Sequence, residues 1–407
     1  MKALVVERLP QRFAAARIAA AVLGSGSGVA VGPLRLLEID PPALPAAGWR
    51  RLRPRLAGIC GSDLSTLDGT SSRYFEPIVT FPFVPGHEVV GELVDGPDAG
   101  ARVVIEPVLG CAARGIEPPC APCASGHKDR CENLTLGHIH PGLQTGYCAD
   151  TGGGWSEELV VHESQLRPVP DGLSDEAAVI IEPTACAVHA VLRADVTQGE
   201  RVIVLGAGTL GLLCVAALRQ LALPAALLAV ARHPVQRDLA ATLGADQVVA
   251  EDDLPRAARR LSASVAVGRK EGRLERLGGG ADVVFDCVGS SASLAQSLAV
   301  TRPGGRIVLV GMPSTVHVDL APLWQRQVSL LGTYAYGTEE FVGRVEPTFT
   351  FATELVAAAH LERLVTARYP LERYEDAVRH AANAGKRGAV KVAFDLRRNR
   401  SWQTGGA

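Results

Sequence analysis

The sequence has no sustained run of basic residues and no marked excess of either charge. Lysine and arginine together number 41, against 43 aspartate and glutamate residues, which gives a formal net charge of −2 at pH 7. Proteins that depend on electrostatic attraction to nucleic acid or to an anionic membrane usually carry a clear positive excess. We therefore expect no nucleic-acid partner and no membrane partner.

A hydrophobic run long enough to cross a bilayer is missing as well. The nearest candidate, Val202–Leu218, is uncharged over 17 residues, whereas a membrane-spanning helix needs about 20. This run contains three glycines and is closed by Arg201 and Arg219. A buried strand followed by a helix explains it better.

The start of the chain lacks the apolar core and cleavage site of a signal peptide, because Glu7 and Arg17 interrupt an alanine-rich stretch. We expect a cytoplasmic protein. Nine cysteines then favour metal or thiol chemistry over disulfides, since the cytosol keeps thiols reduced. At 407 residues, 47% of them hydrophobic, the chain is expected to form two domains.

The segment Arg201–His233 predicts a strand, a glycine turn, a helix and a second strand. Gly206, Gly208 and Gly211 have the G-x-G-x-x-G spacing of dinucleotide-binding turns. The first glycine permits the tight turn, the second lets backbone approach a pyrophosphate, and the third lets helix pack closely on strand. The helix that starts at Thr209 and Leu210 would offer free N–H groups to the phosphates.

Two further strand patterns strengthen this prediction, since three glycines alone also occur in ordinary turns. Val283–Phe285 and Arg306–Val310 are short apolar runs that follow turn signals. Repeated strand-turn-helix units predict a doubly wound parallel sheet, that is, an α/β Rossmann domain.

Cysteine, histidine and carboxylate occur close together in two short motifs of the first half, at Cys60 and at His87-Glu88. These are zinc ligands, and three protein ligands that leave one position open form the catalytic arrangement. Taken singly, such residues are more often packing residues.

A cluster of four cysteines follows within 21 residues, and it can close a tetrahedral shell with no open position, as structural zinc sites do. Its members are Cys111, Cys120, Cys123 and Cys131. Reduced free thiols are the alternative. A nucleic-acid-binding zinc ribbon is disfavoured, because no basic or aromatic surface accompanies the cluster.

The order of these motifs resembles the zinc-containing medium-chain alcohol and polyol dehydrogenase family, from about residue 32 to about residue 395. The motifs are Gly58–Asp63, Gly86–Glu88, the cysteine cluster, Glu182-Pro183 and the glycine turn. The resemblance implies a mainly antiparallel (GroES-like) catalytic domain beside the Rossmann domain. It also implies a division into a catalytic domain (1–182, with a structural-zinc lobe at 111–131), a Rossmann domain (183–333) and a return to the catalytic domain (334–407).

The resemblance further implies roles for the site residues. Zinc would be held by Cys60 and His87, with Glu88 or Glu182 completing the shell directly or through water. Ser62 stands at the family's usual position for a hydroxyl that relays the proton. One departure concerns the cysteine lobe: the family's first cysteine falls where this chain has Glu117, so either Cys111 completes the shell from farther away or that site is altered.

The expected function is a zinc-dependent oxidoreductase that transfers hydride between NADP(H) and a polyol, sugar or related secondary alcohol. NADP is favoured because Ala231 replaces the usual ribose-binding acid, while Arg232 and His233 can bind a phosphate. A simple alcohol dehydrogenase that uses NAD and a zinc-independent quinone or enone reductase remain alternatives. We expect a homodimer or homotetramer.

Three regions are harder to interpret. The segment 11–30 is expected to be a surface insertion with a helix over Gln11–Leu23 and a linker over Ser25–Gly28. Tyr334 and Tyr336 are either pocket or core residues. The polar end, Arg397–Ala407, is expected to fray.

Overall fold

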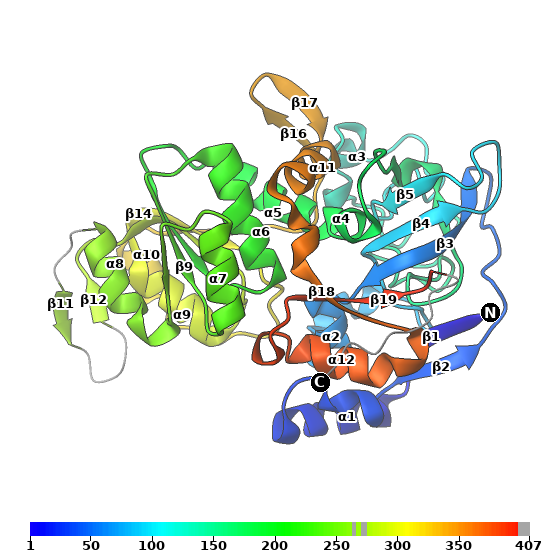
Figure 1. Cartoon of the computed structure of the whole chain (residues 1–407), viewed down its shortest axis with the longest axis horizontal. Helices are drawn as coiled ribbons and strands as arrows, with labels where there is room; N and C mark the ends of the chain where they lie inside the picture. The colour runs from blue at the N-terminus through cyan, green and yellow to red at the C-terminus, as the bar shows by residue number, and fades with distance from the viewer. Residues whose placement is uncertain (263–265, 270–274, 398–407) are drawn as a thin grey trace.

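Six short apolar strands form one wholly parallel sheet, as predicted for the Rossmann domain. In the computed structural model, which describes residues 1–262, 266–269 and 275–397, this sheet lies on one side of the molecule (Figure 1). Its spatial order is β10 (Gln247–Val249), β9 (Ala226–Val230), β8 (Arg201–Leu205), β13 (Ala281–Asp286), β14 (Thr301–Leu309) and β15 (Ser329–Gly332).

Both faces of this sheet are covered, which explains why its central strands β8, β9 and β13 are mostly apolar and buried. Along β8, Val202 and Val204 belong to one core cluster, whereas Ile203 and Leu205 belong to another. The first core lies under α5 (Ile181–Ala194), α6 (Thr209–Ala217) and α11 (Thr348–Ala359). The second core lies under α8 (Leu254–Ser262) and α9 (Ser291–Val300). The doubly wound prediction is therefore confirmed.

The other side of the molecule is built on a seven-stranded sheet in which one strand pair alone is parallel. Its strands are β18 (Val365–Tyr369), β19 (Lys391–Asp395), β3 (Trp49–Gly58), β4 (Val89–Leu93), β5 (Arg102–Ile105), β7 (Leu166–Pro168) and β6 (Leu159–His162). The last strands of the chain thus pair with its first third, because β19 lies antiparallel to β3. We retain 1–182, 183–333 and 334–407 as the proposed domain division.

The N-terminal segment is ordered as a strand and a helix. β1 (Lys2–Val6) pairs with β2 (Leu34–Glu38), and α1 (Pro10–Leu23) lies between them in sequence. The expected linker Ser25–Gly28 was partly wrong: a 3₁₀ turn, η1 (Ser27–Ala30), begins inside it and Gly28 is buried. Among the residues that the structure describes, no helix combines the length and apolar composition needed to cross a membrane.

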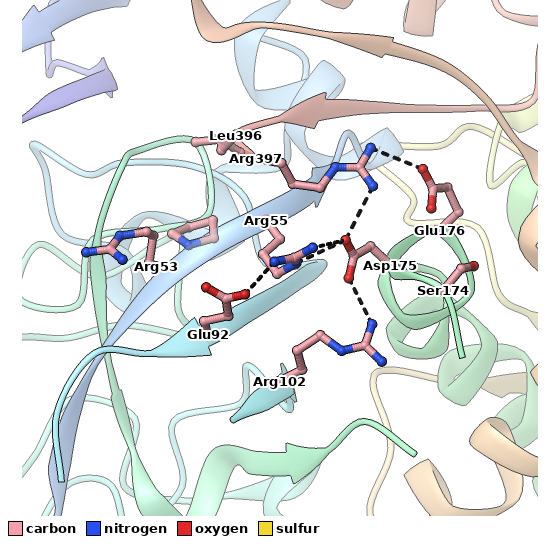
Figure 2. Close-up of a pocket in the computed structure, with 10 residues that line it drawn as sticks. Arg53, Arg55, Glu92, Arg102, Ser174, Asp175, Glu176, Leu396 and Arg397 are labelled. Carbon is pink, nitrogen blue, oxygen red and sulfur yellow. Dashed lines mark hydrogen bonds and ion pairs between the residues drawn. The ribbon is translucent and has the colours of Figure 1, made fainter. Parts of the chain in front are cut away.

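The prediction that the chain frays from Arg397 was also wrong for that residue, because Arg397 belongs to a cluster of arginines around Asp175. The rest of the predicted segment, residues 398–407, lies outside the described part of the chain. Asp175 opens α4 (Asp175–Val179), just before the chain crosses into α5. Figure 2 shows Arg55, Arg102 and Arg397 converging on its carboxylate from three directions. The nitrogen–oxygen distances are 3.0, 3.1 and 3.3 Å respectively.

We predict that Asp175→Asn lowers stability at neutral pH. Burial opposes ionisation of Asp175, but its arginine partners outweigh burial and lower the pKa of the carboxyl below its ordinary value. The contribution of the Asp175 carboxylate to stability is therefore present at neutral pH and is lost as the pH falls through its folded-state pKa. We expect a loss of about 1–3 kcal/mol, less than for a fully buried pair because the arginines are partly exposed.

Thermal melting at several pH values tests this prediction. The difference in melting temperature between Asp175→Asn and the unmodified protein should be largest near neutral pH and should become smaller below about pH 5. Glu92→Gln is the matched control, since the Glu92 carboxylate also pairs with Arg55 but is partly exposed. Equal melting temperatures for Asp175→Asn and the unmodified protein at pH 7 would contradict the role of this cluster.

Candidate active site and cysteine lobe

The helix α2 (Gly61–Leu67) positions the first group of candidate ligands. Cys60 lies immediately before the helix, and its backbone N–H donates to Asp63 Oδ2 at 2.9 Å, so the helix start is capped by its own third residue. Candidate ligand atoms of Cys60, His87 and Glu88 all lie within 4.8 Å of one another. The structure therefore brings together three residues that the sequence separates by up to 28 positions.

Glu88 is held by a lysine that the sequence analysis did not single out. Lys391, on β19, forms an ion pair with Glu88 Oε2 and donates to the Ile59 carbonyl at 3.1 Å. Both side chains are almost fully buried. A Cβ atom on Gly58 would lie 1.9 Å from Glu88 Oε2, so only glycine leaves room for the carboxylate there.

Glu182 approaches the same site from α5 but stays outside the close group of three. Its Oε1 accepts a hydrogen bond from the Tyr336 hydroxyl at 2.8 Å and lies 3.8 Å from Cys186 Sγ. Burial and the nearby Glu88 charge raise the pKa of Glu182 to about 7, although His87 opposes the shift. The geometry thus favours Glu88 over Glu182 as the direct third ligand.

Asp63 and Tyr147 support the histidine from behind. Asp63 Oδ1 lies 3.6 Å from His87 Nδ1 and accepts from the Tyr147 hydroxyl at 3.2 Å. Burial disfavours a charged histidine, yet Asp63, Cys60 and Glu182 outweigh burial and raise the pKa of His87 to about 10. The pocket therefore favours positive charge at its centre, as a site for a divalent cation should.

Ser62 occupies the first turn of α2. Its Oγ is buried close to Tyr147, without a hydrogen bond of good geometry to any described residue. A buried hydroxyl with free donor and acceptor capacity, beside a candidate metal centre, is suited to move a proton.

The four cysteines of the predicted structural site form the second group. Their sulfur atoms all lie within 4.8 Å of one another, with Cys111 Sγ 3.6 Å from Cys120 Sγ and 3.8 Å from Cys131 Sγ. Backbone and side-chain amides of Asn133 donate to two of the sulfurs, at 3.4 and 3.3 Å. N–H donors of this kind stabilise thiolates and hence metal ligation.

Cys111, and not Glu117, belongs to this group. Glu117 is exposed at the surface. The buried Arg114 folds the intervening loop, because it donates to the carbonyls of Leu109, Leu136 and Gly142 at 3.0, 3.0 and 2.6 Å. The longer loop thus presents Cys111 to the other three sulfurs.

The glycine turn has the geometry that a dinucleotide requires. Gly206 has a positive φ of 87°, and a Cβ on Gly211 would lie 1.7 Å from the Gly206 carbonyl oxygen. A Cβ on Gly208 would meet no heavy atom within 4 Å, so this backbone faces open space. Gly208, Thr209 and Leu210 line one cleft of about 1840 Å³ together with Cys60, Ser62, His87, Glu88 and Glu182.

Arg232 and His233 also line this cleft. They follow β9, where Ala231 is fully buried. The Arg232 side chain is 72% exposed and pairs with Glu251 Oε2 at 2.8 Å. The imidazole of His233 lies against Gly385, since a Cβ atom on Gly385 would lie 2.2 Å from His233 Cδ2.

The two tyrosines left open by the sequence have different places. Tyr334 is 41% exposed and lines the cleft, whereas Tyr336 is buried behind Glu182 and packs edge-on against Phe349.

Of the supporting residues that could not be singled out from the sequence, Lys391 had a visible signal. It is a lone charge inside the apolar run Ala389–Phe394. Tyr147 had none.

Family models and curated relatives match most of the chain. Residues 46–171 match an alcohol dehydrogenase GroES-like domain, and residues 209–348 match a zinc-binding dehydrogenase domain. The chain is 29% identical to L-idonate 5-dehydrogenase of Vitis vinifera over 381 residues, which is 89% of this chain and 93% of that protein. It is 31% identical to the probable D-xylulose reductase A of Aspergillus fumigatus over 300 residues, 70% of this chain and 75% of that protein.

A solved structure shows the same fold. The rspB alcohol dehydrogenase of Escherichia coli CFT073, complexed with NADH, superposes with a TM-score of 0.70 at 22% identity. The match covers 97% of this chain and 99% of that one.

We predict two zinc ions per chain with separable roles. Cys60→Ser should abolish turnover while the fold survives, because it removes a ligand of the open site. Cys123→Ser should mainly lower the melting temperature, because a closed cysteine site contributes folding energy. Each variant should retain about one zinc per chain by elemental analysis.

Cys148→Ala is the matched control, since Cys148 is buried beside the lobe but lies outside the group of four. It should keep two zinc ions. A fully active preparation that contains fewer than two zinc ions per chain would overturn the prediction.

Proposed function

Because the chain belongs to the zinc-containing medium-chain alcohol and polyol dehydrogenase family, we propose that it oxidises a polyol, sugar or related secondary alcohol with NADP and catalyses the reverse reduction. One observation carries the proposal. The close group of Cys60, His87 and Glu88 and the open backbone of Gly208 line the same cleft, and hydride transfer requires metal and nicotinamide at one place.

The residues of the site have distinct proposed tasks. Cys60, His87 and Glu88 would hold zinc, with Glu182 facing it, and bound zinc supplies a Lewis acid that lowers the pKa of the substrate hydroxyl. Lys391 neutralises Glu88 and fixes its position. Asp63 orients His87, and Ser62 accepts the hydroxyl proton and passes it on.

The substrate class rests on the relatives and on the cleft wall. Two relatives are named for idonate and xylulose, which are polyhydroxy compounds. The hydroxyl- and amide-bearing residues Ser65, Thr66, Ser71, Thr80 and Gln144 line this chain's cleft. A simple alcohol substrate with NAD is the second candidate, favoured by the phenylalanines on the same wall.

Two further features of the protein are proposed with this function. None of the nine cysteines forms a disulfide in the structure, which supports a reducing compartment such as the cytoplasm. The edge strand β15 presents Leu330 at 40% exposure, which supports pairing of subunits into a homodimer or homotetramer.

We predict that Ser62→Ala reduces kcat by roughly 10²-fold or more, the usual effect of losing a positioned acid–base group. Cofactor affinity should stay unchanged, because Ser62 lies at the metal end of the cleft. Thr70→Ala, which removes an exposed hydroxyl just beyond α2, is the control. Single-turnover kinetics are the measurement, and an unchanged rate of hydride transfer would show that Ser62 carries no proton.

We predict a preference for NADP over NAD of roughly 10- to 100-fold in kcat/KM, the effect of one charged hydrogen bond to the 2′-phosphate. Ala231 supplies no carboxylate to repel that phosphate, and Arg232 can bind it. The double variant Ala231→Asp with Arg232→Ile should invert the preference. Glu251→Gln should increase it, because Glu251 competes for Arg232. A kcat/KM for NAD equal to or above that for NADP would refute the assignment.

A further inference from the structure

The helix α1, predicted from the sequence as part of a surface insertion, forms part of the wall of the catalytic cleft. Arg8, Phe13 and Arg17 all line it. Phe13 meets Phe81 edge-on, with ring centroids 6.0 Å apart. The aromatic contacts continue from there through Phe83 and Tyr147 to His87, with centroid separations of 5.1, 5.2 and 6.0 Å. The insertion is therefore connected to the candidate active site by one series of packed rings.

The α1 segment is also fixed to the helix that carries the reactive residues. The buried Asp68, which ends α2, accepts hydrogen bonds from Ser25 Oγ at 2.6 Å and from Gly26 N–H at 3.1 Å. Gly69 has a φ of 64°, and a Cβ there would lie 2.8 Å from the Phe13 carbonyl oxygen. Since α2 starts beside Cys60, this anchoring sets the distance between α1 and the metal end of the cleft.

The side chains of Arg8 and Arg17 have no hydrogen bond or ion pair within the described part of the chain. The carboxylates of the cleft, by contrast, each have a partner. These pairs are Glu76 with Arg73, Asp129 with Arg130, Glu88 with Lys391 and Glu182 with Tyr336. Arg8 and Arg17 are exposed, and no carboxylate that lines the cleft is left to pair with them. The nearby Asp68 is buried and accepts its hydrogen bonds from Ser25 and Gly26.

The cleft also carries cations that lie outside the α1 segment, including Arg232 and Lys386. There the phosphates of the bound dinucleotide supply the counter-charge. Because the series of packed rings that starts at Phe13 leads to His87, a substrate held at the metal end can bring negative charge near Arg17.

We propose that α1 is a substrate-recognition element and that Arg17, assisted by Arg8, binds an anionic group of the substrate. The group is a carboxylate or a phosphate ester on the end of a polyhydroxy chain whose reacting carbinol lies at the metal end. The helix α2 spans about 10 Å from Gly61 to Leu67 at about 1.5 Å per residue, so such a substrate is several carbons long. This inference rests on the proposed function and narrows its substrate class.

The test compares matched substrates with matched variants. The substrates are D-glucitol, its 6-phosphate and D-gluconate, so that neutral, phosphate and carboxylate forms share one carbon skeleton. The variants are Arg17→Met, Arg8→Met and, as control, Arg12→Met, which removes an arginine of the same helix that does not line the cleft. Zinc content, melting temperature and NADP(H) affinity are measured for each.

The unmodified enzyme should turn over one anionic substrate with a higher kcat/KM than D-glucitol. Arg17→Met should lower that value by roughly 10- to 100-fold, mainly through KM, as the loss of a charged hydrogen bond predicts. Turnover of D-glucitol should stay within about twofold. Arg12→Met should leave kcat/KM unchanged for both substrates.

Two negative outcomes separate this inference from the proposed function. Equal kcat/KM for neutral and anionic substrates, or equal losses for both in Arg17→Met, would overturn the role of α1 and leave the dehydrogenase assignment intact. No turnover of any polyol would overturn the proposed substrate class. In that case, calorimetric binding of D-glucitol 6-phosphate that is lost in Arg17→Met alone would still support an anion site at α1.

Discussion

The buried ion pair between Glu88 and Lys391 is the interaction on which the site depends most. Taking a carboxylate out of water is costly, and removing one partner of a buried pair typically costs about 3–5 kcal/mol. Lys391 comes from β19, near the end of the chain, and Glu88 from the turn before β4. The site therefore requires the last strand to return beside β3, where it also lies over Gly58.

The same requirement connects the site to the Rossmann sheet. Glu182 stands at the start of α5, which leads out of the antiparallel sheet, and its partner Tyr336 lies just after the chain returns from β15. Both crossings thus meet at one buried carboxylate. A change in the position of either crossing would leave Glu182 without its donor, so packing between the two sheets and chemistry in the cleft depend on each other.

Features set by nearby residues could be predicted from the sequence, and features set by distant partners could not. The Rossmann turn and the cysteine cluster depend on spacings within a few dozen residues, because strand, turn and ligand geometry are local. Lys391 and Tyr336 lie 303 and 154 residues from the carboxylates they bind. The polar, glycine-rich end of the chain predicted fraying at Arg397, and its partner Asp175, 222 residues away, could not be foreseen from local sequence. The position of α1 on the cleft wall likewise depends on Asp68, which no local pattern connects to Ser25 and Gly26 just after that helix.

The cysteine lobe shows how a change of spacing can be accommodated. Moving the first cysteine from position 117 to Cys111 lengthens the loop, and a longer loop needs something to fold it back. Arg114 holds the loop in place by donating hydrogen bonds to three backbone carbonyls, although this buries its guanidinium completely. Burial lowers the pKa of Arg114, while Cys148, Cys131 and Cys111 act in the opposite direction. Four thiolates around one Zn²⁺ would leave a net negative charge, and that charge would be a counterpart of the buried arginine. The residue that folds the longer loop would thus also balance the charge of a zinc-loaded site.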